Sequence, residues 1–463
     1  MDLEQVKNYY LKERERILSE LKQFLSFKSI STNSSFKTEC IQCAKWLSSH
    51  FEACGLESTL IETPTLPLVY SWYNCSPEAP TVVFYGHYDV QPPDPLEAWE
   101  SDPFCAVEKN GRLYARGAQD NKGQLFYFVK AVEFLLKQKA LNCNLKIIIE
   151  GEEESGGKGI TSVLNDIKDK IKGDVLLVCD TGTPYAEAGA VTVGLRGIIA
   201  LTVEITGPRK DLHSGVHGGV APNPAQILCT LLSSLHNKDG SVAVTGFYEG
   251  IAEPTAEELK LLNTFPVTDN LYKELTGVLP LGGERDKDLL IRRGFRPTLE
   301  INGITSGYTG QGMKTIVPHN AEAKISCRTV VGQKKPEELL NLVCSQIEKN
   351  FNDMFPNKES GLHLRIKEKV TAGEALKVNP TSWHIQKASE ILKEITGKET
   401  IFIWEGASIP IISELSKVSG ALPLLVGFGL EEDNIHAPNE SFSLEQFMKG
   451  FLFCSLFLSK AEK

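Results

Sequence analysis

The sequence of 463 residues lacks the features that define several classes of protein. No apolar run approaches the roughly 18 residues that indicate a membrane-spanning helix. The N-terminus, Met1-Asp-Leu-Glu4, carries acid where a signal peptide needs basic residues. Positive charge is also in deficit, because 49 Lys and Arg face 59 Asp and Glu and leave a net charge of −10. We therefore expect a cytoplasmic protein that binds neither nucleic acid nor a membrane surface.

A disulfide or zinc framework is not indicated either. The 11 cysteines are odd in number and scattered from Cys40 to Cys454, and cytosolic thiols are mostly reduced. Cys40 and Cys43 form a C-x-x-C motif, but the sequence has no second copy to complete a zinc site. Because the motif lies within an amphipathic helical pattern, we interpret it as the face of a structural helix rather than a metal or redox site.

What the sequence does contain is the composition of a soluble globular protein, with 41% apolar and 23% charged residues. A chain of this length exceeds one ordinary hydrophobic core, so two domains are expected. Helical patterns alternate with short apolar segments up to residue 193, which favours a mostly parallel α/β sheet. The helices are expected at 3–27, 38–53 and 124–138, and the strands at 57–62, 69–73, 81–85, 145–149 and 174–179.

The pattern changes at Gly194 and changes back near residue 376. Extended segments at 191–206, 298–304, 320–330 and 362–368 accompany helices at 223–236 and 336–351, whereas 238–295 is polar and poorly periodic. Helix and strand then alternate again, at 379–395, 400–403, 408–418, 422–426 and 442–459. We expect an α/β domain formed by 1–193 and 374–463, interrupted by an α+β domain at 194–373.

An acidic stretch, Glu150-Gly-Glu-Glu-Glu-Ser-Gly-Gly157, follows the predicted strand at 145–149. Its carboxylates repel one another unless a positive charge lies among them, and a divalent metal ion would supply that charge. The glycines allow a sharp turn at the carboxyl end of the strand, where open α/β sheets usually carry their sites. The alternative is a solvated acidic loop. A phosphate loop is excluded, because the Gly-Lys-Ser/Thr ending is absent.

Further polar residues follow other predicted strands or begin predicted helices. They are candidates for the metal ligands and the nearby base that metal-assisted hydrolysis requires. His87 and Asp89 are two apart and point the same way on an extended backbone, so that one can bind a metal while the other orients it. Glu153 and Glu154 are adjacent and face opposite ways, so that one can be a ligand and the other a base. The complete candidate set is His87, Asp89, Asp120, Glu153, Glu154, Asp180 and His436.

These motifs together resemble the di-zinc amidohydrolases that include carnosine-type and Cys-Gly dipeptidases, glutamate carboxypeptidase, acetylornithine deacetylase and succinyl-diaminopimelate desuccinylase. The resemblance covers nearly the whole chain. It implies a di-metal exopeptidase-like catalytic domain with a mixed, mostly parallel sheet, plus an inserted α+β lid and dimerisation domain. Its segments occur in the family's order: Gly86-His-Tyr-Asp-Val-Gln-Pro92, Arg116-Gly-Ala-Gln-Asp-Asn-Lys-Gly123, the acidic stretch, Asp211-Leu-His-Ser-Gly215 and His436.

The resemblance also implies a ligand set for two divalent metal ions, for which zinc or manganese would both be suitable. One metal would be bound by His87 and Asp180, and the other by Glu154 and His436. Asp120 would bridge the two metals, and the peptide bond after it resembles one that is cis in the family.

Three further roles follow from the same resemblance. Asp89 would orient His87, and Glu153 would be the general base that takes a proton from the attacking water and returns it to the leaving amine. The family pattern Glu-Glu-x-Gly fits residues 153–156, which leaves Glu152 in a variable position. His213 resembles a histidine that reaches the oxyanion from the inserted domain of a partner subunit. The alternative for His213 is a polar loop, and the nearby His217 has no assigned role.

Substrate-binding residues can be matched as well. Thr315 and Arg328 resemble dipeptidase residues that hold the substrate's C-terminal carboxylate, which a guanidinium grips with two hydrogen bonds. The alternative for Arg328 is a surface ion pair. Glu405-Gly-Ala-Ser408 resembles a Glu-Gly-Gly-Ser loop, in which Ser408 would line the pocket and Glu405 could meet a free amine.

Two departures from the family pattern affect specificity, and a third, at Asn121, should matter less. Trp404 stands where dipeptidase relatives commonly carry Arg, and Ala407 replaces the second glycine of the loop. Both put the dipeptide preference in doubt. Asn121 stands where the dipeptidases often have Asp, but the bridging role belongs to Asp120.

We therefore predict a di-metal hydrolase that cleaves an amide bond in a small dipeptide, with Cys-Gly or carnosine as the type of substrate. An N-acyl amino acid deacylase or a carboxypeptidase is the nearest alternative, and a non-catalytic binding protein on the same fold is a more remote one. We also expect a homodimer formed through 194–373, and domain closure that brings His213 and Arg328 to the substrate.

Overall fold

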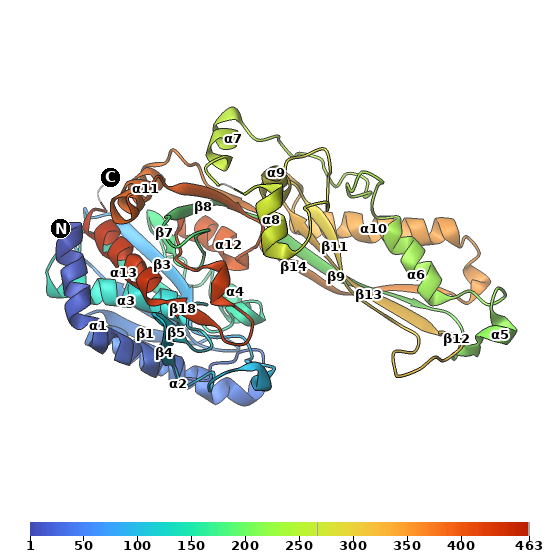
Figure 1. Ribbon diagram of the computed structural model, residues 1–463, viewed down its shortest axis with the longest axis horizontal. Coiled ribbons are helices and arrows are strands. Elements are labelled where there is room, and N and C mark those ends of the chain that lie inside the picture. Colours follow the sequence, from blue (N-terminus) through green and yellow to red (C-terminus); the bar gives the residue numbers. More distant parts are fainter. Residues whose placement is uncertain (266, 462–463) are drawn as a thin grey trace. The chain divides into compact units, whose positions relative to one another are not determined.

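The computed structural model describes residues 1–265 and 267–461 (Figure 1). The chain forms two compact units. Unit 1 comprises Met1–Val193, Val378–Ile403 and Ile411–Lys463, and unit 2 comprises Gly194–Lys377 and Trp404–Pro410. The predicted boundaries lie at 193/194 and 373/374, and the prediction leaves the short segment 404–410, which belongs to unit 2, in the α/β domain. None of the helices described is long and apolar enough to cross a membrane.

Unit 1 is built on a mixed sheet whose four central strands, in the order β6-β3-β7-β17, are parallel. Antiparallel strands β1 and β2 flank β6, and β8 flanks β17. This arrangement confirms the predicted mixed, mostly parallel sheet. The strands are β1 Glu57–Ile61, β2 Leu68–Tyr73, β3 Thr81–His87, β6 Asn144–Glu150, β7 Val175–Val178, β8 Ala190–Leu195, β16 Ile401–Glu405 and β17 Leu422–Leu425, with β4 Val107–Lys109, β5 Arg112–Tyr114 and β18 Ser441–Ser443 in a smaller sheet.

Helices cover this sheet, and their apolar stripes supply its core. α1 begins with a capping box in which Asp2 accepts from the backbone N–H of Gln5. One face of this helix, which includes Val6, Tyr10, Ile17 and Leu21, is buried, and Tyr10 packs against Phe451 with ring centroids 5.4 Å apart. The helices are α1 Leu3–Leu25, α2 Lys37–Ala53, α3 Lys122–Lys137, α4 Lys158–Val163, α11 Trp383–Thr396, α12 Pro410–Ser419 and α13 Leu444–Ser459. Cys40 and Cys43 are buried on α2, and all eleven thiols are unpaired.

Unit 2 is a four-stranded antiparallel sheet, in the order β11-β13-β9-β14, against which α6 and α10 pack (Figure 1). Alternate residues of β9, such as Ile199 and Leu201, join the core with the helices, as the period of two in a strand requires. The strands are β9 Gly197–Thr206, β10 Leu212–His213, β11 Thr298–Ser306, β12 Ile316–Val317, β13 Asn320–Thr329, β14 His363–Ala372 and β15 Leu376–Lys377. The helices are α5 Ser214–His217, α6 Pro224–Ser233, α7 Ala256–Leu262, α8 Asp269–Thr276, α9 Leu289–Phe295 and α10 Pro336–Met354.

Candidate metal centre

The candidate ligands gather because neighbouring parallel strands end at the same edge of the sheet. His87 is the last residue of β3, and Glu150 is the last residue of β6, its partner in register. β7 lies on the other side of β3 and leads into Asp180. Ligands in open α/β sheets are bound at this carboxyl edge. The sheet topology therefore brings three separate segments of sequence to one point.

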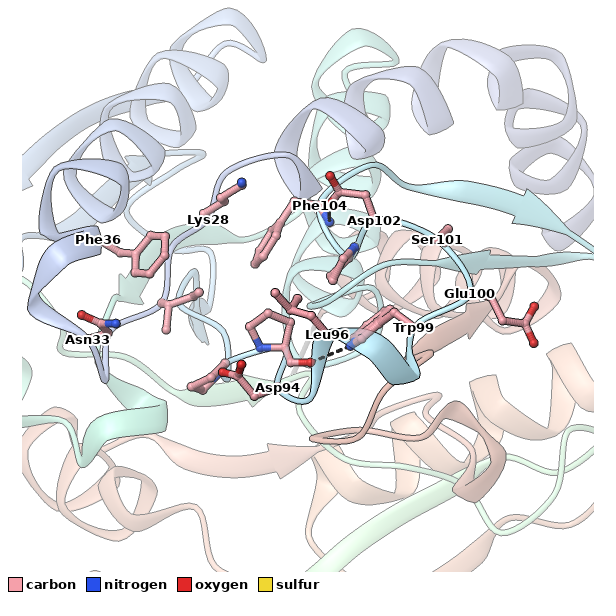
Figure 2. Close-up of a pocket in the computed structure, with 14 residues that line it drawn as sticks. Lys28, Asn33, Phe36, Asp94, Leu96, Trp99, Glu100, Ser101, Asp102 and Phe104 are labelled. Carbon is pink, nitrogen blue, oxygen red and sulfur yellow. Dashed lines mark hydrogen bonds between the residues drawn. The ribbon is translucent and has the colours of Figure 1, made fainter.

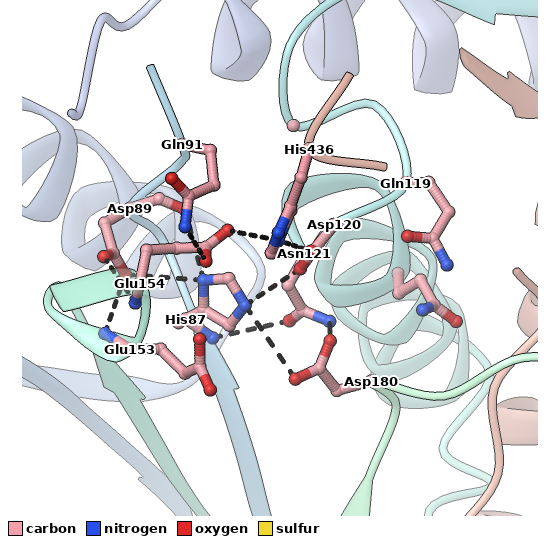
Figure 3. Close-up of polar contacts among 12 residues, drawn as sticks. His87, Asp89, Gln91, Gln119, Asp120, Asn121, Glu153, Glu154, Asp180 and His436 are labelled. Carbon is pink, nitrogen blue, oxygen red and sulfur yellow. Dashed lines mark hydrogen bonds and ion pairs between the residues drawn. The ribbon is translucent and has the colours of Figure 1, made fainter. Parts of the chain in front are cut away.

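The first ligand group consists of His87, Asp120 and Asp180. The His87 Nε2 atom lies 3.2 Å from Asp120 Oδ1 and 3.9 Å from Asp180 Oδ2 (Figure 3). His87 is fully buried. The imidazole and the two carboxylates thus direct one nitrogen and two oxygens at a common point.

The second ligand group consists of Asp120, Glu154 and His436, and it shares Asp120 with the first. The His436 Nε2 atom lies 2.9 Å from Asp120 Oδ2 and 3.3 Å from Glu154 Oε1. The two oxygens of Asp120 therefore face different groups, as a bridging carboxylate requires. The bond from Asp120 to Asn121 is cis, which confirms the conformation implied by the family resemblance.

The residues present fit a pair of divalent cations. His87 Nε2 and Glu154 Oε1 are buried atoms without a hydrogen-bond partner, although both point into the ligand groups. A buried polar atom left without a partner is costly, and one metal ion in each group would satisfy these two atoms. Two sets of one nitrogen and two carboxylate oxygens suit zinc or manganese.

The electrostatics of the cluster lead to the same conclusion. Burial, together with the nearby Asp120 and Glu154 carboxylates, raises the pKa of Asp180 to about 7 against the opposing effect of His87. Hydrogen bonds to Asp120 and Glu154 raise the pKa of His436 to about 10. The clustered carboxylates thus create a negative electrostatic potential, which disfavours further negative charge and favours a bound cation.

Asp89 connects the ligands to one another. Its side chain accepts hydrogen bonds from the backbone N–H groups of Glu153, at 3.2 Å, and Glu154, at 3.1 Å. It also accepts from the Ser31 hydroxyl at 2.6 Å and lies 3.4 Å from His87 Nδ1. The His87 Nδ1 is also 3.1 Å from the backbone carbonyl oxygen of Asp89, within hydrogen-bond distance. Asp89 thus positions the imidazole mainly with its backbone and the turn that carries the acidic stretch with its carboxylate.

The three consecutive glutamates have different environments. The Glu152 carboxylate bonds to the Thr65 hydroxyl and to the Gly159 N–H, which tie it to the loop outside the cluster. The Glu154 carboxylate belongs to the second ligand group. Burial raises the pKa of Glu153 well above its usual range, and Asp180 and Glu154 contribute to that rise against the effect of His87. Glu153 therefore lies within the electrostatic field of the cluster without belonging to either ligand group.

Three residues that hold this site had been given no role in it from the sequence. The Gln91 amide donates to Glu154 Oε2 at 2.8 Å, and the Asn121 amide donates to Asp180 Oδ1 at 2.8 Å (Figure 3). Gln91 follows His87 and Asp89 at a spacing of two, and this period was a usable signal. Glu440 accepts from the backbone N–H of Asp120, and nothing in its surrounding sequence indicates that role.

The predicted substrate-binding residues lie in unit 2, where two of them are in contact. Arg328 Nη1 donates to the Ser408 hydroxyl at 2.8 Å. The Glu405 carboxylate is in an ion pair, because both of its oxygens accept from Arg293 Nη2, at 2.9 and 3.1 Å. Arg293 lies on α9, far from Glu405 in the sequence, and was not among the predicted site residues.

His213 and Thr315 meet in a separate part of unit 2. They lie on or beside the two-stranded pair β10–β12, in which His213 is opposite Ile316, and the Ser214 N–H donates to the Thr315 carbonyl. His213 is exposed, and its Nδ1 accepts from the Gly215 N–H at 3.0 Å. His217 ends the short helix α5. No described contact joins His213 to Arg328.

A cavity of about 770 Å³ lies elsewhere in unit 1, along the loop that follows Gln91 (Figure 2). Its wall includes Phe36, Trp99 and Phe104, and the Lys28 ammonium lies 5.6 Å from the centre of the Phe104 ring. None of the candidate metal ligands lines it. Its size alone gives it no part in the chemistry of the cluster.

Two ligand groups that share a carboxylate, with a further glutamate beside them, define a metallohydrolase site on an α/β sheet. The sequence profile of the peptidase family M20/M25/M40 matches residues 83–460. The chain belongs to this family of metallopeptidases.

Individual relatives agree with this assignment. The chain is 29% identical to the Cys-Gly metallodipeptidase dug1 of Schizosaccharomyces pombe over 98% of both chains. It is 29% identical to the human Beta-Ala-His dipeptidase over 86% of this chain and 78% of that protein. Among solved structures, the M20 family metallo-carboxypeptidase Sso-CP2 of Sulfolobus solfataricus matches with a TM-score of 0.84 and 28% identity, covering 96% of this chain and 99% of that one.

Proposed function

We propose that the protein is a metal-dependent dipeptidase that hydrolyses the amide bond of small dipeptides. The observation that carries this proposal is the pair of ligand groups sharing Asp120, with Glu153 in their field. The Cys-Gly and Beta-Ala-His dipeptidases among the relatives support the choice of substrate class. We further propose that zinc or manganese is the metal, that the enzyme is cytoplasmic, and that it forms a homodimer through unit 2.

The chain's own residues divide the work of the reaction. His87 and Asp180 would hold one divalent cation, Glu154 and His436 the other, and Asp120 both. Such a pair of cations lowers the pKa of a water between them and polarises a carbonyl. Glu153 takes the proton of the attacking water and delivers it to the leaving amine, so that its carboxyl group is alternately base and acid. Asp89 holds the His87 imidazole and the Glu153 backbone in position during the reaction.

The residues of unit 2 would act on the substrate rather than on the metals. Arg328 would hold the C-terminal carboxylate with its fork of donors, while Ser408 fixes the guanidinium by the hydrogen bond already described. His213 and Thr315 lie together near the start of β13, at its opposite end from Arg328. They would therefore reach the substrate from unit 2 of the partner subunit, where Thr315 would contact the same carboxylate and His213, which is exposed, would donate from Nε2 to the oxyanion.

An N-acyl amino acid deacylase or carboxypeptidase is the second candidate, and one observation favours it. Glu405, the residue expected to meet a free amine, is engaged by Arg293 and by the N–H of Gly406. A carboxylate already neutralised by a guanidinium attracts an ammonium group less strongly. A substrate without a free amine would suit such a site.

A panel of substrates separates the two candidates. Cys-Gly, carnosine, other dipeptides and N-acyl amino acids are incubated with protein that has been treated with chelator, before and after zinc or manganese is restored, and amine release is measured. Cleavage of dipeptides that depends on restored metal supports the dipeptidase. Cleavage of acyl amino acids alone would show that the protein is a deacylase and not a dipeptidase. If no substrate is cleaved although metal is bound, the catalytic proposal is wrong.

A further inference from the structure

The loop 405–408 of unit 2 is surrounded by three arginines from distant parts of the sequence. Arg293 pairs with the Glu405 carboxylate. Arg196 donates from Nε to the Gly406 carbonyl at 2.9 Å and from Nη1 to the Arg296 carbonyl. Arg328 donates to the Ser408 hydroxyl. Each residue of this guanidinium cluster, Arg196, Arg293 and Arg328, therefore contacts a different residue of one short loop.

Strand geometry explains why two of these arginines share one face of the sheet. Ile198 of β9 is opposite Arg328 of β13, and Ile199 is opposite Cys327. Ile199 and Cys327 point into the core under the helices. Because side chains alternate along a strand, Arg328 points to the other face of the sheet. Arg196 directly precedes β9 and lies two residues before Ile198, so it is on that same face.

Gly406 allows the close approach of Arg196. A Cβ atom at this position would lie 2.8 Å from Arg196 Nη2 and 3.5 Å from Arg293 Cγ. A side chain would therefore displace the guanidinium. The loop backbone and the cluster fit together because residue 406 is glycine.

The charges of the cluster do not balance. The described residues place one carboxylate within ion-pair distance of the three guanidiniums. It is that of Glu405, which pairs with Arg293. Arg196 and Arg328 bond to neutral carbonyl and hydroxyl oxygens. Burial, together with the positive charges of Arg328 and Arg293, lowers the pKa of Arg196 to about 10, and Glu405 and Glu300 oppose this shift. Two half-buried cations thus lack an anion.

We propose that Arg196 and Arg328 bind the two carboxylates of one substrate residue, so that the enzyme prefers a C-terminal Glu or Asp. Arg328 holds the main-chain carboxylate, as in the function proposed above, on which this inference rests. Arg196 holds the side-chain carboxylate, and Arg293 keeps Glu405 from repelling it. The ligand class is a dicarboxylate: an Xaa-Glu or Xaa-Asp dipeptide, or an N-acyl derivative of Glu or Asp.

Matched pairs of substrates test this preference in the wild-type protein with its metals. Ala-Glu and Ala-Gln differ in the charge of one side chain and hardly in shape, and Ala-Asp with Ala-Asn gives a shorter pair. We expect kcat/KM to favour the acidic member by on the order of 10–100-fold, the range of a charge-assisted hydrogen bond. The ratio should fall as salt rises. N-acetyl-Glu with N-acetyl-Gln shows whether the preference extends to acyl amino acids.

Two variants connect the preference to the cluster. Arg196→Gln should bring the Glu-to-Gln ratio near one, whereas Arg196→Lys, which keeps the charge without the fork, should retain part of it. Glu405→Gln removes the negative charge of the cluster and should raise the ratio above that of the wild type. A purely structural role for these residues would change the rates on both substrates equally. Because each result is a ratio, partial loss of folded protein does not affect it.

The outcomes separate this inference from the proposed function. Metal-dependent cleavage of Ala-Gln with an equal or lower rate on Ala-Glu would overturn the inference and leave the dipeptidase intact. If no substrate is turned over, the proposed function fails, and titration calorimetry of Ala-Glu and Ala-Gln with the full chain decides the inference. Tighter binding of Ala-Glu that is lost in Arg196→Gln would then support the dicarboxylate site, and equal binding would reject it.

Discussion

Glu440 offers the clearest test of how the fold holds the shared metal ligand. Its Oε2 accepts from Arg116 Nη1 and from the Gly117 N–H, both at 2.8 Å. Its Oε1 accepts from the N–H groups of Gln119, at 3.0 Å, and Asp120, at 3.1 Å. The Arg116 and Glu440 side chains are each 1% exposed. One buried carboxylate therefore fixes the loop that delivers Asp120.

In Glu440→Gln, an amide NH₂ replaces one of these oxygens. Whichever oxygen it replaces, two buried donors then face another donor. Leaving each unpaired costs roughly 1–3 kcal/mol, and breaking one side of a buried ion pair costs about 3–5 kcal/mol in total. For a unit of this size we expect the melting temperature to fall by on the order of 6–15 °C.

Differential scanning calorimetry measures this change. The transition of unit 1 is the one that moves when zinc or manganese is added, because a ligand stabilises the state that binds it. Glu445→Gln is the matched control: Glu445 is 65% exposed and pairs with Lys449, so its loss should cost less than about 1 kcal/mol. The Glu440 variant should also retain less metal after dialysis. A shift no larger than that of the control, with full metal content, would refute the role of Glu440.

Three other predictions concern catalysis, substrate binding and pH. Glu153→Gln should keep its metals, measured by elemental analysis, but lower kcat by roughly 10²–10⁴-fold; near-normal kcat would exclude Glu153 as the base. Arg328→Lys should raise KM for dipeptides with a free carboxylate, and an equal loss on carboxamide-capped substrates would contradict that contact. Burial, and then Lys130, lowers the pKa of His50 to about 4. The unfolded chain thus binds more protons below pH 6.5, and acidification from pH 7 to 5 should cost about 2 kcal/mol. In His50→Gln this part of the fall in melting temperature should disappear, and an unchanged pH profile would be inconsistent with the buried neutral imidazole.

The metal centre could be predicted because its parts have local signals in the sequence. His87 and Asp180 follow short apolar strands, and the glutamates follow another, so their convergence depends on parallel pairing alone. Hydrophobic alternation and periodicity were sufficient for these elements. The spacing of two that relates His87 to Asp89 also relates Asp89 to Gln91, whose contact with Glu154 was open to the same reasoning.

The residues that support the site could not be predicted in this way. Glu440 reaches Asp120 across 320 positions of sequence, and Arg293 reaches Glu405 across 112. Such pairs depend on tertiary packing and leave no periodic trace. The short helices α7, α8 and α9 were missed within 238–295 for a related reason. Each has eight residues or fewer, which is too short for periodicity to be evident, although side-chain caps mark their starts at Thr255, Thr268 and Asp288.

The departures at Trp404 and Ala407 acquire a different meaning in the structure. Trp404 is 5% exposed and packs against Phe295, with ring centroids 5.1 Å apart. Added Cβ atoms at Gly194 and Gly294 would lie within 2.5 Å of its atoms, so the two glycines make room for the indole. Trp404 is therefore a buried packing residue beside Gly194, Gly294 and Phe295.

Ala407 contributes its backbone, since its carbonyl accepts from the Arg196 N–H at 3.2 Å. Neither departure removes a group from the loop that contacts the guanidinium cluster. The charge around that loop comes from Glu405, which Arg293 holds from α9, and from Arg196 and Arg328. Specificity should therefore follow the balance among Arg196, Arg328 and Glu405. A substitution at Trp404 should alter the stability of unit 2 before it alters the choice of substrate.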